Sequence, residues 1–194
     1  GRVAAVVEAA EGTEAASSPG EINGGVYCFA ASWLWESLKR IEPSSGGERY
    51  LTSLAAIGAA EGSTVIGVAA EDPGELLGVN NRLQLAQVEG VLRQRIRQRW
   101  MLAGVTMADP ASVFVDADVS IGQDTVLLPH TTLLGRTSIG EGCEIGPGSV
   151  VRDSTVGNRC RVTASVLESA TMEDDVDIGP FSHLRSGAYL EPGV

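Results

Sequence analysis

A six-residue repeat of branched apolar side chains, running over residues 115–190, restricts the fold more than any other feature of the sequence. It starts with Val115 and Ile121, slips by one position at Val150 and ends at Leu190. A period of six fits neither an α-helix nor a single strand, and a fixed longer period is typical of a solenoid whose coils stack on one another. The stretch therefore predicts a β-solenoid.

Small residues follow many of the apolar positions and predict the corners of the coils. Tight corners favour glycine, whereas a branched residue supplies one inward side chain for each face. Because three units of six make one triangular turn, we expect about four turns beginning at residues 112–115. The glycines in question are Gly122, Gly140, Gly146, Gly157 and Gly179.

A long helix is predicted immediately before the solenoid, over residues 83–102. One apolar stripe at spacings of three and four supports it, and its length is about 30 Å. Gly104 and Asp109-Pro110 break the pattern after it. Its arginines fit a solvated face that covers neighbouring apolar surface, and the alternative is contact with an acidic partner. The stripe consists of Leu85, Val88, Leu92, Ile96 and Trp100.

The first 82 residues alternate short apolar runs with helical stretches, which predicts α/β packing. They contain no phosphate-cradling glycine loop of the kind that opens many nucleotide-binding domains. The expected strands cover residues 2–8, 22–29 and 63–70, and the expected helices cover residues 33–41, capped by Ser32, and 50–62.

Composition excludes several classes of function. A net charge of −11 argues against nucleic acid or an anionic membrane as the main partner. Cys28, Cys143 and Cys160 form no CxxC pair, which favours a reducing, cytoplasmic setting and small core or corner roles for the thiols. We see no signal peptide and no membrane-spanning apolar run. The abrupt ends at Gly1 and Val194 suggest a piece of a longer protein.

Three stretches, in this order, resemble one bacterial enzyme family. They are GVNNRLQL at residues 78–85, LAGVTMADP at residues 102–110 and the hexapeptide solenoid. Together they are similar to the bifunctional N-acetylglucosamine-1-phosphate uridylyltransferase / glucosamine-1-phosphate acetyltransferase. The run IGPFSHLRSG at residues 178–187 fits the early coils of the acetyltransferase domain, and residues 21–27 and 50–52 fit the uridylyltransferase domain.

The resemblance implies a domain organisation and an assembly. Residues 1–82 would be the C-terminal part of a Rossmann-like nucleotidyltransferase domain, residues 83–102 a linking helix, and residues 103–194 the first coils of a left-handed parallel β-helix. It also implies a cytoplasmic homotrimer that uses Mg²⁺, UTP, acetyl-CoA and glucosamine-1-phosphate to make UDP-N-acetylglucosamine for the cell envelope. The resemblance places the catalytic histidine of acetyl transfer beyond residue 194, so we expect this piece alone to be inactive.

The resemblance also assigns roles to four residues of this sequence. Glu8 and Asn23 fall where the family contacts the N-acetylglucosamine group, and Asn80 falls where it supplies a Mg²⁺ ligand. Arg185 falls where the family holds the phosphate of glucosamine-1-phosphate, a task that suits a guanidinium fork. Departures from the family pattern occur at Gly24, Ser53 and Ser186, where the family has Thr, Asp and Pro.

Each assigned residue also has an ordinary structural interpretation. Glu8 can be a strand-end acid, Asn23 and Asn80 turn or capping residues, and Arg185 a solvated coil residue. Asn81 is the better N-cap for the long helix, which leaves Asn80 available to a ligand.

Two histidines and two competing functions remain open at this point. Neither His130 nor His183 has a catalytic partner placed by the sequence, although His183 stands two residues from Arg185. One alternative function is a monofunctional sugar-phosphate nucleotidyltransferase whose solenoid serves only assembly or regulation. The other is a non-catalytic, trimerising piece.

Overall fold

A computed structural model describes residues 1–7 and 22–194, so Glu8 lies outside the described residues. The chain divides into two compact units, residues 1–80 and residues 81–194. The long helix belongs to the second unit, together with the solenoid. Within the described part of the chain, none of the helices has the length and apolar character needed to cross a membrane.

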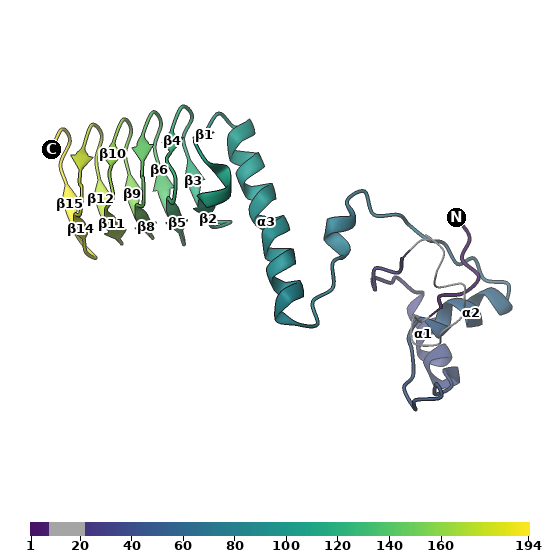
Figure 1. The fold of residues 1–194 in the computed structure, drawn as a ribbon. Helices are drawn as coiled ribbons and strands as arrows, with labels where there is room; N and C mark the ends of the chain where they lie inside the picture. Colours follow the sequence, from purple (N-terminus) through teal and green to yellow (C-terminus); the bar gives the residue numbers. More distant parts are fainter. Residues whose placement is uncertain (8–21) are drawn as a thin grey trace. The chain divides into compact units, whose positions relative to one another are not determined.

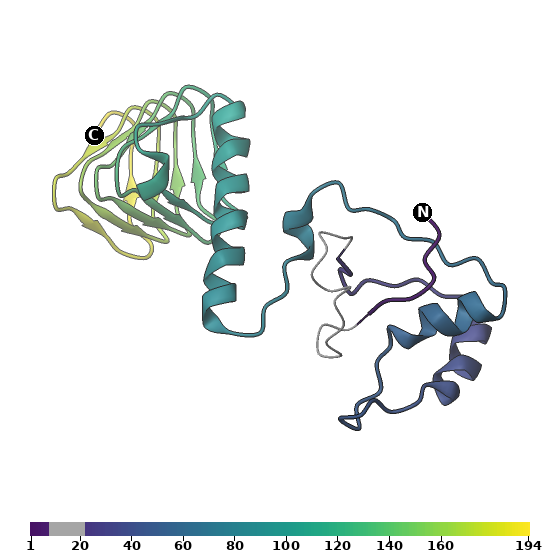
Figure 2. The same ribbon diagram turned by 45° about the vertical axis from the view of Figure 1, so that its right-hand side comes forward.

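The second unit is a parallel β-solenoid of three five-stranded sheets, as the sequence period predicts. The coils are triangular in cross-section (Figure 2), and the architecture fits a left-handed parallel β-helix. The first sheet holds β1 (Thr106–Met107), β4 (Val126–Leu127), β7 (Glu144–Ile145), β10 (Arg161–Val162) and β13 (Asp177–Ile178). The second holds β2 (Phe114–Val115), β5 (Thr132–Leu134), β8 (Val150–Arg152), β11 (Val166–Glu168) and β14 (His183–Leu184). The third holds β3 (Ser120–Ile121), β6 (Ser138–Ile139), β9 (Thr155–Val156), β12 (Thr171–Met172) and β15 (Tyr189–Leu190).

Two details of the predicted repeat are wrong. The solenoid begins at Thr106, one side earlier than expected, because the 3₁₀ turn η5 (Pro110–Ser112) lengthens the first side and hides it from a six-residue count. The inward residue of β8 is Val151, which is fully buried, whereas Val150 faces outward and is only half-buried. The shortened side therefore lies after Val151, not before it.

The core of the solenoid is a stack of inward aliphatic side chains, one for each strand. Alternation along a strand turns the flanking residues outward, so each two- or three-residue strand buries a single side chain. Isolated coils could not exclude water from these side chains, and stacking supplies that burial. The fully buried members include Leu127, Leu133, Ile145, Val162 and Leu167.

Hydroxyl and thiol side chains at the corners join successive coils. Thr125 Oγ1 donates to the carbonyl of Gly140 at 2.8 Å and accepts the N–H of Cys143 at 3.1 Å. The Cys143 thiol repeats the pattern in the next coil, donating to Gly157 O and lying 3.4 Å from Cys160 N. Such bonds satisfy buried backbone groups that a corner would otherwise leave unpaired.

The helix α3 (Arg82–Leu102) lies against the first coil of the solenoid (Figure 1). Asn81 caps it, its Oδ1 accepting the N–H of Gln84 at 2.9 Å, as predicted. Only the C-terminal half packs on the core, through Ile96 and Trp100. Leu85 and Leu92 of the predicted stripe are 53% and 51% exposed.

Two arginines of α3 cover aromatic rings, as expected if the helix arginines shield neighbouring apolar surface. The Arg93 guanidinium lies 4.2 Å from the centre of the Phe114 ring and pairs with Glu89. The Arg99 guanidinium lies 4.6 Å from the ring of Trp100. These contacts shield apolar surface at the junction of helix and solenoid.

The first unit holds helices where they were expected but little strand. Its helices are α1 (Ala31–Ser37), continued by η3 (Leu38–Arg40), α2 (Ser53–Ala60) and the short turn η4 (Pro73–Leu76). The predicted Ser32 cap is wrong, because α1 begins at Ala31 after an Ala30 N-cap that has no side-chain bond.

Within residues 1–7 and 22–80, the expected strands of this unit reduce to one antiparallel contact. Arg2 bridges Ile66, with Val3 N donating to Val65 O at 3.0 Å, and residues 22–29 form no strand. A strand requires a hydrogen-bonded neighbour, and among the described residues of this unit the only backbone pairing of this kind is the bridge between Arg2 and Ile66. Ile22 and Val68 are each 91% exposed as a result.

Candidate functional site

The predicted site residues divide between the two units. Asn23 and Asn80 belong to the first unit, whereas Arg185 belongs to the second. Each position is therefore described from its own surroundings.

Asn23 is held in a defined orientation by two neighbours. Its Oδ1 accepts the N–H of Gly25 at 3.0 Å, and its Nδ2 donates to the hydroxyl of Tyr27 at 2.6 Å. The Tyr27 ring stacks on Phe29 at 5.7 Å, and Phe29 stacks on Trp33 at 6.0 Å. The amide of Asn23 is thus supported by an aromatic row that leads to α1.

The departure at Gly24 has a local physical reason. A Cβ at this position would stand 2.7 Å from Cδ2 of Leu76, so a threonine would require the exposed Leu76 side chain to shift. The contact also places the segment of Asn23 against η4, four residues before Asn80.

Asn80 is exposed and stands directly before the capping residue Asn81. An exposed amide oxygen fits Mg²⁺, which proteins hold through one or two ligands while phosphates and water complete the octahedron. Among the residues that the structure describes, no cluster of three or more His, Cys, Asp or Glu side chains could hold a metal. Asn80 therefore fits a metal ion that arrives bound to a nucleotide, with Asn80 as one ligand.

Arg185 follows β14 on the outward side of the second sheet and is exposed. His183 points outward on the same strand, and its Nε2 lies 3.0 Å from Oε2 of Glu168 on β11. This partner of His183 could not be found from the residues alone, because Glu168 comes 15 residues earlier and meets the ring only through coil stacking.

His130 occupies a coil corner in left-handed backbone conformation, with φ of 61°. Its backbone N–H donates to Ser112 Oγ at 3.1 Å. Asparagine, aspartate and histidine are the residues that tolerate this conformation best after glycine, which accounts for a histidine here on structural grounds.

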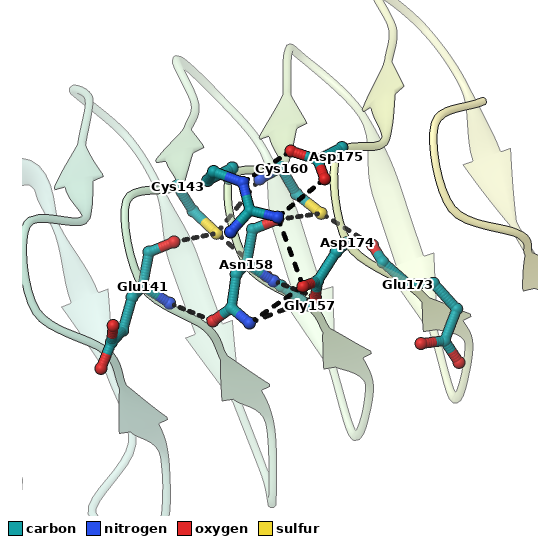
Figure 3. Close-up of polar contacts among 9 residues, drawn as sticks. Glu141, Cys143, Gly157, Asn158, Cys160, Glu173, Asp174 and Asp175 are labelled. Carbon is teal, nitrogen blue, oxygen red and sulfur yellow. Dashed lines mark hydrogen bonds and ion pairs between the residues drawn. The ribbon is translucent and has the colours of Figure 1, made fainter.

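A polar network at one corner of the solenoid was not predicted from the sequence (Figure 3). Asn158 Oδ1 accepts the N–H of Glu141 at 2.9 Å, and Asn158 Nδ2 donates to both carboxylate oxygens of Asp174. Arg159 forms two 2.7 Å bonds to Asp175. Hydrogen bonds to Asn158 lower the pKa of Asp174, and the Arg159 fork lowers the pKa of Asp175.

The two cysteines beside this network are structural. Cys143 and Cys160 are both about 1% exposed, and desolvation raises the pKa of each thiol. A thiol that resists ionisation is a poor nucleophile and a poor metal ligand. The corner role predicted for them is confirmed, whereas Cys28 is exposed and belongs to neither core nor corner.

Comparison with known proteins first defines the class. Residues 118–153 match the family described as bacterial transferase hexapeptide (six repeats). Together with the triangular parallel coils, this match shows that the chain carries the hexapeptide repeats found in bacterial transferases.

Relatives then define the particular family. The chain is 42% identical over 195 residues to the bifunctional protein GlmU of Heliobacterium modesticaldum, covering 100% of this chain and 43% of the relative. It is 43% identical to GlmU of Fervidobacterium nodosum, covering 96% of this chain and 40% of the relative. The GlmU of Pelobacter propionicus is 40% identical, covering 100% of this chain and 43% of the relative. The chain thus spans less than half the length of these relatives, and it belongs to the GlmU family.

Proposed function

We propose that this chain is the junction of a bifunctional sugar-nucleotide enzyme. The parent protein would acetylate glucosamine-1-phosphate with acetyl-CoA and then transfer uridylyl from UTP, releasing pyrophosphate and forming UDP-N-acetylglucosamine for the cell envelope. The observation that supports this most strongly is the 40–43% identity, along the whole chain, to proteins named bifunctional GlmU.

In this proposal the first unit contributes to uridylyl transfer. Asn23, with its amide fixed by Tyr27 and Gly25, would hold the N-acetylglucosamine group together with Glu8. Asn80 would offer its amide oxygen to Mg²⁺, which stabilises the charge that develops on the phosphates when bound. Residues 1–82 would form the C-terminal part of the nucleotidyltransferase domain.

The second unit contributes to acetyl transfer. Arg185 would hold the phosphate of glucosamine-1-phosphate through its planar fork of donors. Residues 103–194 would supply the base of the acetyltransferase β-helix, joined to the first domain by the helix over residues 83–102. Stacking of flat coil faces would assemble three copies in the cytoplasm. The chain alone would complete neither reaction.

Reciprocal variants in the intact parent protein test these roles. Asn80→Ala should weaken Mg²⁺-dependent pyrophosphate release and spare acetyl transfer, whereas Arg185→Ala should do the reverse. Matched controls are Asn81→Ala, which removes a helix cap next to Asn80, and Arg161→Gln, which removes an arginine from another solenoid face. Equal loss of both activities in Asn80→Ala would contradict the metal assignment. Sedimentation of this chain as a clean monomer would contradict the trimer.

A further inference from the structure

A short strip of charged side chains lies on the outward side of the second sheet, at its C-terminal end. It consists of Arg152 on β8, Glu168 on β11, His183 on β14 and Arg185 directly after it. With a neutral imidazole the strip carries a net charge of +1, and with a protonated imidazole it carries +2. A positive strip on a chain of net charge −11 is a local exception to the acidic surface.

Strand register fixes the order of these side chains. Glu168 pairs directly with Arg152, and Val166 pairs with His183, which places Glu168 beside the end of β14. Alternation along a strand turns His183 and Arg185 to the same side, with about 7 Å between their Cα atoms.

The contact with Glu168 decides which ring nitrogen of His183 is available to a ligand. An ionised carboxylate only accepts hydrogen bonds, so the 3.0 Å contact requires a hydrogen on Nε2. In the neutral ring, Nδ1 then has no hydrogen and only accepts. In the protonated ring both nitrogens donate, and Nδ1–H can donate to an anion while Nε2–H stays on Glu168.

We propose that His183 is a second anion-binding residue of the sugar-phosphate site, acting beside Arg185 in its protonated form and oriented by Glu168. This inference rests on the proposed function for Arg185. Glu168 faces the imidazole from β11, Arg152 lies beyond Glu168 on β8, and Arg185 lies on the same coil. Two long side chains on the same side of the sheet, with Cα atoms about 7 Å apart, can converge on one tetrahedral oxyanion.

Nuclear magnetic resonance of the imidazole groups provides the test. The chain has two histidines, so His130, at a different coil corner, serves as an internal reference. Sulfate is the probe, because it remains a dianion across the range in which histidine titrates, and chloride keeps the ionic strength constant. Sulfate should shift the His183 resonances and the Arg185 Nε resonance and leave His130 unchanged.

The affinity for sulfate should also follow the charge of the ring. It should be higher at about pH 6 than at about pH 8, because only a protonated ring carries the Nδ1 hydrogen that would be donated to the anion. His183→Gln retains a side-chain donor for Glu168 but no charge, so it should bind sulfate weakly at both pH values. Glu168→Gln should shift the pH dependence, and unchanged amide spectra elsewhere would show that both variants fold.

Separate outcomes bear on the two proposals. A sulfate-dependent shift at Arg185 with a silent His183 would overturn the role of His183 and leave the role of Arg185 standing. Sulfate binding that is unchanged in Arg185→Gln would count against the phosphate site in the proposed function. A pH-independent affinity in the parent chain would also overturn the inference.

Discussion

A single methyl group added at Gly140 should remove much of the solenoid's stability. Gly122, Gly140 and Gly157 occupy the same position in successive coils, each directly after an inward side chain. A Cβ on Gly140 would stand 2.5 Å from the carbonyl oxygen of Gly157 and 2.6 Å from its carbonyl carbon. These are backbone atoms of the next coil, so no side-chain rotation can relieve the contact.

The loss of folding stability can be estimated from the backbone shift that the added methyl group would require. Overpacking in a tight site costs about 1–3 kcal/mol. Separating the two coils also strains the 2.9 Å bond from Gly140 N to Val156 O and the 2.9 Å bond from Glu141 N to Asn158 Oδ1. At about 1 kcal/mol for each bond, we expect Gly140→Ala to lower the free energy of unfolding by about 2–5 kcal/mol.

Urea unfolding followed by circular dichroism measures this change, and Gly90→Ala provides the matched control. Gly90 lies within α3 and a Cβ there would meet nothing within 4 Å. Alanine should stabilise the helix by about 0.5–1 kcal/mol, because glycine loses more conformational entropy on folding. A Gly140→Ala chain as stable as the parent would refute the view that space, and not flexibility, requires glycine at this position.

Three further predictions concern the corners and the cap. Cys143→Thr should keep stability near that of the parent, because Thr125 already makes the equivalent bonds in the preceding coil. Cys143→Val, which has the shape of threonine without its hydroxyl, should lose about 1–3 kcal/mol because Gly157 O and Cys160 N are left unpaired. Urea titrations can measure both changes. Burial raises the pKa of both thiols, so their contribution to folding stability is fully present below the ordinary thiol pKa of about 9. That contribution is lost as pH rises through the higher pKa values of the folded state. Cys143→Thr should therefore reduce the fall in melting temperature at alkaline pH. Asn81→Ala should cost about 1 kcal/mol of thermal stability, and Asn81→Asp should restore it.

The solenoid was predictable because its rule is local in sequence. Every inward residue is apolar and many corners hold glycine, so a six-residue count finds both. The count failed where the corners changed length. It accepted Val150 because valine fits a core position, although the ladder pairs Leu133 with Val151.

The first unit was less predictable because strands depend on partners. The apolar runs over residues 22–29 and 63–70 have strand-like composition, but composition does not supply a neighbour. Helices carry their own hydrogen bonds, so α1 and α2 appear close to the expected positions without that help.

The sites follow the same division. Asn81 as a helix cap could be predicted from the residues alone, because a cap needs only the three residues that follow it. The support of Asn23 by Tyr27 required the structure, since a four-residue separation outside a helix fixes no contact. The network of Asn158, Asp174 and Asp175 joins coils 16 residues apart, beyond the reach of any local pattern.

The pairing of Glu168 with His183 depends on departures from the ideal repeat. A strict coil of 18 residues, as between Leu133 and Val151, would set Arg185 over Leu167, whose side chain is buried in the core. The observed offset between Val166 and His183 is 17 residues, and that between Val150 and Val166 is 16. These shortened sides bring Arg152 beside Glu168 and set Glu168 level with Arg185, so His183, opposite Val166, reaches Glu168 diagonally. The residues that make this strip distinctive therefore lie where the repeat is least regular. Inserting one residue after Ser169, between β11 and β14, should keep the solenoid but disturb the register of Glu168 against His183. Loss of the sulfate response of His183 in such a folded variant is the expected result, and a retained response would show that register does not control the strip.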